Sequence, residues 1–336
     1  MAETILITGG CGFIGTNFVR HMLDRYDYTI INLDKLTYAG NLENLEDIEG
    51  KGRYIFVRGD IASMGDIEPV FERSIDVVVN FAAESHVDRS IMDPDTFIRT
   101  NINGTFNLLE MARKKGVRRF VQISTDEVYG SLGDSGAFRE DTPLSPNSPY
   151  SASKTAADIL AMAYFKTYGM PVIVTRCSNN YGPYQFPEKL IPLMITNALA
   201  DRELPVYGDG LNVRDWIHVK DHCSAIDLVV HKGEDGNVYN IGASNERTNI
   251  EIVELVLEAL GKPRSLIRYV KDRPGHDRRY AIDSRKITEE LGYSPSVDFS
   301  EGMRDTVNWY VKNKGWWERI KTGEYLDYYE KMYGNR

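Results

Sequence analysis

The side chains best suited to chemistry in this sequence lie in two short segments. The first, residues 124–130, carries Thr125 and the adjacent carboxyl groups of Asp126 and Glu127. The second follows at a loop's distance and holds a tyrosine and a lysine one helical turn apart. A hydroxyl, two carboxyls, a phenol and an amine are what is needed to oxidise an alcohol, eliminate water and return the hydride. We interpret these residues as catalytic: Thr125, Asp126, Glu127, Tyr150 and Lys154.

The tyrosine and the lysine are spaced to share one face of a helix. Residues i and i+4 are neighbours on a helix surface, so the side chains of Tyr150 and Lys154 would project together. A free phenol has a pKa of about 10, and a nearby ammonium favours the phenolate, which would make Tyr150 a base near neutral pH. Such pairs also arise by chance on solvated helices. The glycine-rich start of the chain and Thr125 favour the catalytic interpretation.

The adjacent carboxyls suit an elimination, which needs a base on carbon and an acid on oxygen. Burial and mutual repulsion can hold two neighbouring carboxyls in opposite protonation states. Because neighbours on a regular strand face opposite sides, we expect Asp126 and Glu127 just past a strand that ends near Ser124. The alternative is a solvated helix start, where an Asp–Glu pair would serve as a cap or a partner of the helix dipole.

Alternating strand and helix patterns would position these groups. Short β-branched runs alternate with longer helical patterns in the first half of the chain, which indicates a parallel sheet covered on both faces. The expected fold class is α/β, a doubly wound parallel sheet of the Rossmann type with a smaller C-terminal α/β lobe. The expected strands are residues 5–8, 29–33, 54–57, 77–81, 120–124 and 172–176, and the expected helices are 14–25, 66–74, 93–115 and 151–168.

After Cys177 the alternation loosens, so we expect a second, smaller lobe. A helix near residues 190–200, a strand at 238–241 and a helix at 250–260 can still be recognised. That strand and residues 216–230 are expected to return to the first sheet. The predicted domains are residues 1–178 with 213–243 for the dinucleotide-binding domain, and residues 179–212 with 244–336 for the smaller lobe.

A glycine-rich turn follows the first strand. Gly9, Gly12 and Gly15 are spaced by three residues and open a helix. Glycine permits a tight turn and the close approach of a pyrophosphate, whose charge the helix N-terminus favours. Asp34 ends the second strand about 20 residues later, where a carboxylate binds an adenosine ribose and repels a 2′-phosphate, so we expect NAD rather than NADP. A purely structural turn is the alternative.

Two later strand ends extend the same site. Asp60 and Ile61 follow the third strand and could hold the adenine edge. Phe81, Ala82 and Ala83 follow the fourth strand and supply small residues beside the cofactor. Asp60 could equally cap a turn or a helix.

Composition excludes several functions. The 336 residues are 42% hydrophobic and 26% charged, with a net charge of −9 that disfavours nucleic acid. No export signal opens the chain and no apolar run approaches the roughly 18 residues of a membrane span. Three cysteines without paired spacing predict reduced thiols in the cytoplasm. The histidines show no metal-binding spacing, so no metal is expected, and the basic stretch 262–286 fits an anionic small ligand.

The glycine turn, the later hydroxyl and the YxxxK spacing together resemble the extended short-chain dehydrogenase/reductase superfamily across nearly the whole chain. Within it, further segments are similar to the dTDP-glucose 4,6-dehydratase family, with no departure in the catalytic motif. The resemblance implies bound NAD, a two-lobed fold, a homodimer formed through helices of the first lobe and a dTDP-sugar substrate. The segments that carry it are residues 82–90, 124–130, 179–190 and 272–277.

That resemblance also implies a reaction, which agrees with the chemistry of the residues. Tyr150, assisted by Thr125 and Lys154, takes the proton of the sugar C4 hydroxyl while hydride leaves C4 for NAD. The resulting ketone acidifies the C5 proton, so Glu127 can act as a base while protonated Asp126 gives a proton to the departing C6 hydroxyl. Hydride then returns to C6 and leaves a 4-keto-6-deoxy sugar.

The ligand contacts are expected from the same motifs and resemblance. A guanidinium at Arg214 can hold phosphate oxygens bidentately, and its alternative is an ion pair with Asp215 or Asp209. Expected contacts with NAD are Gly9, Gly12, Phe13, Ile14, Gly15, Asp34, Lys35, Thr37, Asp60, Ile61, Phe81, Ala82, Ala83, Ser85, Thr100, Tyr150, Lys154 and Asn180. Expected contacts with the substrate are Ser85, Thr125, Asn179, Lys189, Leu190, Pro205, Tyr207, Arg214, Asn249, Arg273 and His276.

Three alternatives remain at this point. A sugar 4-epimerase or a UDP-glucuronate decarboxylase would share the NAD site and the Tyr–Lys pair, but neither needs carboxyls in both the acid and the base role. A UDP-glucose 4,6-dehydratase would need similar catalytic groups and differs in how the base is recognised. A noncatalytic NAD-binding sensor could dispense with Thr125, Tyr150 or Lys154, and all three are present.

Overall fold

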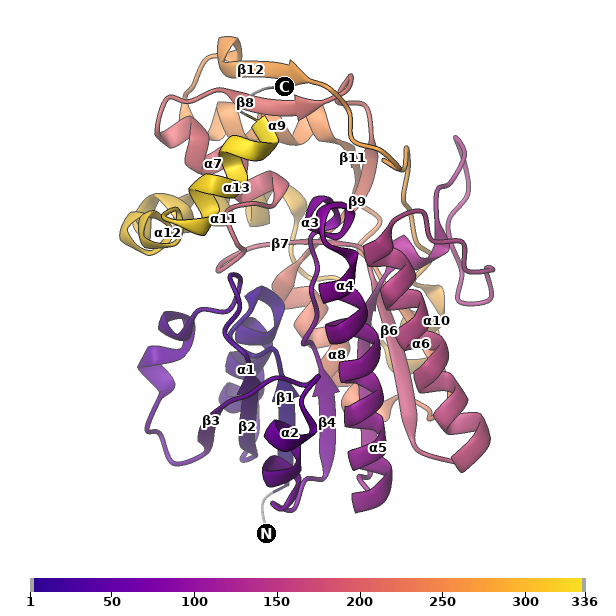
Figure 1. Ribbon diagram of the computed structural model, residues 1–336. Coiled ribbons are helices and arrows are strands. Elements are labelled where there is room, and N and C mark those ends of the chain that lie inside the picture. The colour runs from indigo at the N-terminus through magenta and orange to yellow at the C-terminus, as the bar shows by residue number, and fades with distance from the viewer. Residues whose placement is uncertain (1–2, 334–336) are drawn as a thin grey trace.

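A parallel β-sheet forms the centre of the larger lobe (Figure 1). The computed structural model describes residues 3–333. The strands of this sheet are β1 (Thr4–Thr8), β2 (Thr29–Asp34), β3 (Tyr54–Arg58), β4 (Val77–Asn80), β5 (Arg119–Thr125), β6 (Val172–Cys177) and β10 (Val238–Ile241). They lie in the order β10-β6-β5-β4-β1-β2-β3, and every neighbouring pair is parallel. The switch in strand order between β1 and β4 creates the crevice where ligands bind in such sheets.

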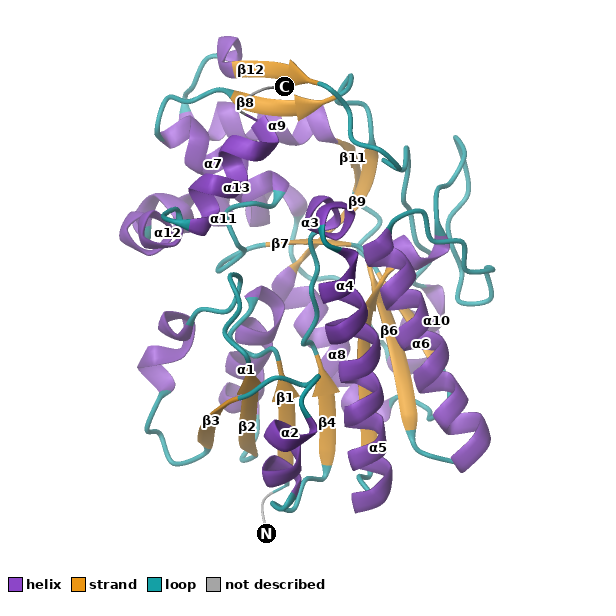
Figure 2. Ribbon diagram, in the orientation of Figure 1, coloured by secondary structure: helices purple, strands orange, loops and turns teal. Residues whose placement is uncertain are grey.

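Helices cover both faces of this sheet, as Figures 1 and 2 show. One face packs against α1 (Phe13–Arg25), α8 (Val219–Lys232) and α10 (Arg285–Leu291), and the other against α2 (Met64–Phe71), α5 (Thr105–Lys115) and α6 (Pro149–Tyr168). Strands between two helical layers bury both faces, which explains their continuous β-branched runs. The predicted doubly wound α/β fold is confirmed.

The predicted helix over residues 93–115 is divided into unlike segments. It contains α4 (Pro94–Phe97), a π-helical turn η2 (Ile98–Gly104) and α5, and is preceded by α3 (Val87–Met92). Asn101 in the π-helical turn accepts from the Glu84 N–H at 2.9 Å and donates to the Glu84 carbonyl at 3.0 Å and to Ser153 Oγ at 2.8 Å. The turn therefore fixes the loop after β4 against α6. Such turns occur frequently at functional sites.

A smaller lobe lies above the carboxyl ends of the large sheet in Figure 1. Its core joins apolar residues of several helices around a two-stranded parallel sheet. The elements are α7 (Leu190–Leu199), β8 (Leu204–Tyr207), α9 (Asn249–Leu260), η4 (Arg264–Leu266), β12 (Ile267–Val270), α11 (Phe299–Lys312), α12 (Lys314–Ile320) and α13 (Glu324–Tyr333).

A three-stranded sheet lies between the two lobes. It is formed by β7 (Asn179–Tyr181), β9 (Val213–His218) and β11 (Glu246–Thr248) in the order β11-β9-β7. Residues 216–218 therefore do not return to the large sheet as expected, because β9 pairs with β7 and β11; only α8 and β10 return. Helix α10, expected in the smaller lobe, packs into the core of the larger one. The domain limits themselves remain a prediction.

Two general properties follow from these elements. Within residues 3–333, no helix has the length and apolar character to cross a membrane. In the same part of the chain, no three His, Cys, Asp or Glu side chains are grouped so that they could hold a metal ion.

Candidate active site

The glycine-rich turn between β1 and α1 is shaped to receive a diphosphate. Gly9 has a φ of +70°, and its N–H donates to the Leu33 carbonyl at 2.9 Å. A Cβ on Gly15 would collide with the Gly9 carbonyl oxygen, so only glycine lets α1 approach the turn this closely. Gly12 caps α1 without a side-chain hydrogen bond. The first N–H groups of the helix are therefore available to an anion, together with the positive end of the helix dipole.

Asp34, at the end of β2, is held in place by the turn. Its Oδ2 accepts from the Cys11 N–H at 2.9 Å and its Oδ1 from the Leu36 N–H at 2.8 Å. Burial raises the pKa of this carboxyl, and the two backbone hydrogen bonds oppose the rise. Each oxygen keeps a further lone pair for a ribose hydroxyl. The geometry fits the dinucleotide expected from the sequence.

Asp60 makes the turn contact that the sequence allowed, and its contact with the cofactor stays a prediction. Its Oδ1 accepts from the Ala62 N–H at 2.9 Å, as a turn residue does, while Oδ2 pairs with Lys35 Nζ at 2.7 Å. Asp60 and Lys35 also line a large cleft above the carboxyl ends of the strands. The local turn therefore places the carboxylate at the edge of that cleft.

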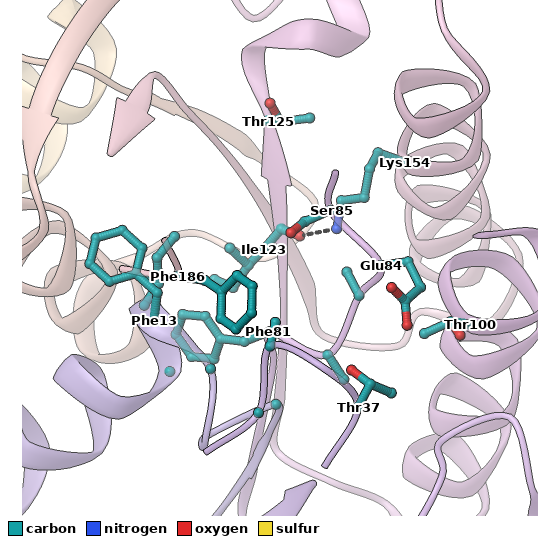
Figure 3. Close-up of a pocket in the computed structure, with 18 of the residues that line it drawn as sticks. Phe13, Thr37, Phe81, Glu84, Ser85, Thr100, Ile123, Thr125, Lys154 and Phe186 are labelled. Carbon is teal, nitrogen blue, oxygen red and sulfur yellow. Dashed lines mark hydrogen bonds between the residues drawn. The ribbon is translucent and has the colours of Figure 1, made fainter. Parts of the chain in front are cut away.

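This cleft, called the central cleft below, is lined by residues that end or closely follow β1 to β6. Figure 3 shows part of its lining, including Phe81, Thr125 and Lys154. All residues expected to contact NAD lie along it, although the contacts themselves remain predictions. These residues are Gly9, Gly12, Phe13, Ile14, Gly15, Asp34, Lys35, Thr37, Asp60, Ile61, Phe81, Ala82, Ala83, Ser85, Thr100, Tyr150, Lys154 and Asn180.

Tyr150 and Lys154 enter the central cleft from the first turns of α6. The helix begins with a capping box between Ser148 and Ser151 and has Pro149 in its first turn, which fixes where the phenol emerges. Lys154 Nζ donates to the Ile123 carbonyl at 2.6 Å (Figure 3). The lysine thus reaches across to β5 as well as lining the cleft.

Burial has the largest effect on the pKa of Tyr150, and the expected effect of Lys154 on that pKa stays a prediction. Burial and the negative charge of Glu127 raise the pKa of Tyr150 well above its ordinary value, while hydrogen bonding with Thr125 opposes the rise. Burial also lowers the pKa of Lys154.

Asp126 and Glu127 lie on a 3₁₀ turn, η3 (Asp126–Tyr129), directly after β5. This is the position predicted for them, past the end of the strand. Thr125 is the N-cap of the turn, and its Oγ1 accepts from the Glu127 N–H at 3.3 Å. Since the hydroxyl does the capping, the two carboxyls are free to face the central cleft, which both of them line.

The surroundings of the two carboxyls differ. Asp126 is 2% exposed, and its Oδ2 has no hydrogen-bond partner among the described residues. Burial and the negative charge of Glu127 raise the pKa of Asp126 well above its ordinary value. Burial raises the pKa of Glu127 as well, but the cations Arg273, Lys189 and Arg214 oppose that rise. Of the two carboxyls, Asp126 is therefore the more readily protonated and Glu127 the more readily ionised.

Arg214 and Arg273 face this carboxyl pair from outside the central cleft. Arg214 donates to the carbonyls of Val213 at 2.7 Å and Asp277 at 2.9 Å, and its guanidinium lies 4.2 Å from the centre of the Tyr280 ring. The alternative ion pairs are not formed: Asp209 pairs with Arg278, and Asp215 accepts backbone N–H groups. The guanidinium is therefore not neutralised by the acids that adjoin it in sequence.

The remaining expected substrate contacts divide into two groups. Ser85, Thr125, Asn179 and Lys189 line the central cleft. Outside it, the Tyr207 hydroxyl donates to Asp88 at 3.2 Å, its ring meets that of His276 edge to face, and Arg273 pairs with Asp88 at 3.7 Å. Residues that neither line the cleft nor join this group are Leu190 at the start of α7, Pro205 on β8 and Asn249 at the start of α9.

Several residues that line the central cleft were not predicted. Ile123, Ser124, Cys177 and Ser178 stand at the ends of β5 and β6, so the rule that ligands bind at the carboxyl ends of strands could have found them. Leu33 and Gly59 adjoin the ends of β2 and β3 and could have been found in the same way. The rest lie on loops without a recognisable local signal. The full unpredicted set is Leu33, Ala39, Gly40, Gly59, Glu84, Ile123, Ser124, Cys177, Ser178, Gln185, Phe186 and Glu188.

One wall of the central cleft is held by an arginine between two aromatic rings. The guanidinium of Arg89 lies 3.8 Å from the centre of the Tyr38 ring and 4.3 Å from that of Tyr328, and its Nε donates to Glu188 at 3.0 Å. We call these four residues the Arg89 clasp. It connects the loop after β2 with α3, the segment before α7 and helix α13.

The fold and this cleft define a class: the chain is an enzyme of the NAD-dependent epimerase/dehydratase type. A family model described as GDP-mannose 4,6 dehydratase matches residues 6–306. A dTDP-glucose 4,6-dehydratase of Xanthomonas campestris is 52% identical over 96% of this chain and 97% of its own length. One from Escherichia coli is 51% identical over the same shares of the two chains. The chain belongs to the dTDP-glucose 4,6-dehydratase family, which confirms the resemblance seen in the sequence.

Solved structures support the same assignment. A dTDP-glucose 4,6-dehydratase of Streptomyces venezuelae, with NAD and dTDP bound, aligns with a TM-score of 0.93 at 52% identity and covers 95% of this chain and 100% of that chain. The enzyme from Bacillus anthracis in complex with NAD aligns at 0.89 and 56% identity over the same shares. A UDP-glucose 4-epimerase of Thermus thermophilus, also with NAD, aligns at 0.87 but only 32% identity, over 93% of this chain and 100% of its own.

Proposed function

We propose that this chain is a dTDP-glucose 4,6-dehydratase, which converts dTDP-glucose into dTDP-4-keto-6-deoxyglucose and water. The observation that carries the proposal is the pair of unlike carboxyls on η3. Asp126 is buried and favours its neutral form, while Glu127 is partly buried and faces three cations. An epimerase or a decarboxylase that shares the Tyr–Lys pair has no need of both an acid and a base at this place.

NAD is the cofactor that fits the central cleft. The glycine turn with the N-terminus of α1 would hold the pyrophosphate, and Asp34 the adenosine ribose. When bound, NAD takes up a hydride from the sugar and gives it back, so the reaction needs no external reductant. The small side chains of Ala82 and Ala83 leave room beside the ring that carries the hydride.

Oxidation at C4 assigns Tyr150 the role of base. Its phenolate would accept the proton of the C4 hydroxyl, with Thr125 donating a hydrogen bond to the C4 oxygen. Burial opposes the phenolate in the described structure, so an added positive charge is required, and an oxidised nicotinamide ring supplies one. Lys154, in hydrogen-bond contact with Ile123, would hold the nearby ribose and keep its own charge close to the phenol.

Elimination assigns opposite roles to the two carboxyls. Once C4 is a ketone, the C5 proton is acidic enough for the Glu127 carboxylate to remove. Asp126, kept protonated by burial and by its neighbour, would give its proton to the departing C6 hydroxyl. The proton gained by Glu127 can then return to C5, which restores Glu127. Asp126 is left ionised and Tyr150 protonated, so one proton must pass from Tyr150 to Asp126 before the next turnover.

Recognition of the nucleotide diphosphate would fall to the smaller lobe. Arg214 and Arg273 carry guanidinium groups that can hold phosphate oxygens bidentately, and Lys189 lines the cleft between them and the catalytic pair. The same three cations lower the pKa of Glu127. The same three cations would therefore bind the substrate diphosphate and favour the ionised form of Glu127, the proposed base.

The proposal is tested by incubating the purified protein with dTDP-glucose and, separately, with UDP-glucose, without added reductant. Mass spectrometry and proton NMR follow the sugar. Loss of one water with a new C6 methyl group and no net NADH is expected, faster with dTDP-glucose. Faster loss of water from UDP-glucose would make the chain a UDP-glucose dehydratase, and an inverted C4 at constant mass would make it an epimerase.

Replacing Glu127 should separate the two halves of the reaction. In Glu127→Gln the base for C5 is lost, so dehydration should slow by roughly 10²–10⁴-fold, while oxidation at C4 continues and the absorbance of reduced cofactor accumulates. Rapid mixing with dTDP-glucose followed by absorbance and mass measurement separates the two steps. Glu318→Gln, on the exposed face of α12, is the matched control and should behave as wild type. Unchanged dehydration in Glu127→Gln would refute the assigned role.

The pH profile should report the cations around Glu127. As a base, Glu127 must be ionised, so kcat rises as pH rises through its pKa, which burial raises and Arg273 lowers. Arg273→Gln removes a positive charge that favours the carboxylate. The low-pH limb of kcat, measured at saturating dTDP-glucose, should therefore move to higher pH. A limb that stays in place or moves to lower pH would contradict the role of Glu127.

We further infer a homodimer formed through α5 and α6, which lie side by side in Figure 1. Large apolar side chains are exposed on this face, with Ile159 58% and Phe106 44% accessible, and such patches mark protein interfaces. Light scattering after gel filtration should give twice the mass of the chain. Phe106→Glu should shift the population to monomer, whereas Val311→Glu on α11, also exposed, should not. A monomeric wild type would refute this arrangement.

The cellular location and the domain limits belong to the same proposal. Cys11, Cys177 and Cys223 are free and buried, which agrees with a reducing compartment such as the cytoplasm. We propose residues 1–178 with 213–243 as the cofactor domain and residues 179–212 with 244–336 as the nucleotide-sugar lobe, except for α10, which packs in the core of the larger lobe.

A further inference from the structure

A buried histidine behind the central cleft contacts a residue that lines it. His222 on α8 is fully buried, and its Nδ1 lies 2.9 Å from Oδ1 of Asn180 on β7. Asn180 lines the central cleft together with Cys177, Ser178 and Tyr150. His222 itself does not line the cleft. It therefore has no direct access to a ligand and can act only through Asn180.

The hydrogen bonds on the other side of Asn180 determine which atoms face His222. Asn180 Nδ2 lies 3.0 Å from the Ser178 carbonyl oxygen, which can only accept. The NH₂ group must face that carbonyl, since the reversed amide would bring two acceptors together. Oδ1 then faces His222, and Nδ1 of the histidine must carry the proton that is donated.

The surroundings of His222 leave this arrangement no alternative. Burial lowers the pKa of His222 to about 3, so the ring is neutral and carries a single N–H. Its Nε2 is buried and has no hydrogen-bond partner among the described residues. A proton on Nε2 would therefore have no acceptor, whereas a proton on Nδ1 is donated to Asn180 Oδ1. An unpartnered buried nitrogen is a cost, and the contact with Asn180 offsets part of it.

The carboxamide of Asn180 is held at both ends and by its backbone. Its Nδ2 is also within 3.5 Å of Cys177 Sγ, and Gln185 Nε2 donates to the Asn180 carbonyl at 2.9 Å. Rotation of the amide about its side-chain bond would break the bonds to both Ser178 and His222. The cleft wall next to Tyr150 therefore presents one fixed pattern of donor and acceptor.

We propose that His222 is a positioning residue which, through Asn180, fixes the nicotinamide end of the bound cofactor for hydride transfer. A nicotinamide bears a carboxamide of its own, which needs a defined donor and acceptor to set the plane of the ring. Hydride transfer depends on that plane, because small misplacements cost large factors in rate. The inference rests on the proposed function, since it requires NAD in the central cleft.

Two amide substitutions at residue 222 separate positioning from packing. The Nδ2 of an asparagine falls where Nδ1 of histidine lies, so His222→Asn keeps a donor for Asn180. A glutamine reaches the Nε2 position instead, so His222→Gln fills the space without donating. Cys223→Ala, the next buried residue on α8, removes packing but leaves Asn180 untouched, and it serves as the control.

The readouts are kcat, KM for dTDP-glucose, thermal stability and the isotope effect with substrate deuterated at C4. For His222→Gln, we expect kcat to fall by about 10–100-fold, the range seen when residues behind a site are removed. KM should be unchanged, and the isotope effect should rise because hydride transfer has become slower. His222→Asn should recover most of kcat, and Cys223→Ala should lose thermal stability alone. A His222→Gln enzyme as fast as wild type, or a His222→Asn enzyme as slow as His222→Gln, would overturn the inference.

Nitrogen NMR of histidine-labelled wild-type holoenzyme tests the same point without any substitution. His222 should show the Nδ1–H tautomer and no titration across the range in which the protein stays folded. The Nε2–H tautomer would overturn the inference even if His222→Gln failed to fold. If wild type does not dehydrate dTDP-glucose, the proposed function fails; if wild type is active and the His222 variants match it, only the role of His222 fails.

Discussion

Taking ionisable groups out of water costs free energy, and that cost governs the catalytic end of the central cleft. Asp126, Tyr150 and Lys154 are each less than a tenth exposed, and burial disfavours the charged form of all three. In water, two neighbouring carboxyls would both be ionised at neutral pH. Here the end of β5, the η3 turn and the capped start of α6 surround these groups. The adjacent carboxyls of Asp126 and Glu127 therefore differ in how readily they ionise.

The low dielectric also gives distant cations a strong effect. Lys189, Arg214 and Arg273 come from three separate segments, yet each favours the ionised form of Glu127. Glu127 belongs to the large sheet, and these cations belong to the strands and loops around the smaller lobe. The smaller lobe therefore does more than provide a surface for a nucleotide: it completes the electrostatics of a carboxyl that the larger lobe carries.

Local patterns were enough to predict much of the fold and the cofactor side of the site. Three features could be recognised in the sequence because each depends on residues close together in the chain. They are the spaced glycines, the β-branched runs and the carboxylate at a strand end. The predicted position of Asp126 and Glu127, just past a strand, is confirmed for the same reason. The expected places of residues 216–218 and of α10 were wrong, because these places depend on pairing and packing partners far along the chain. The contact of Lys154 with the Ile123 carbonyl was not predicted, because it depends on how α6 packs against β5.

The Arg89 clasp joins segments that are synthesised at different times, which limits when it can form during folding. The glycine turn and the loop with Tyr38 leave the ribosome first, but Glu188 follows much later and Tyr328 comes close to the end of the chain. Strand β10, which closes one edge of the sheet, is also synthesised late. Because domains fold as their residues become available, this wall of the cleft can be completed only after Tyr328 has been synthesised. The cleft therefore acquires its glycine turn early in synthesis and this wall late.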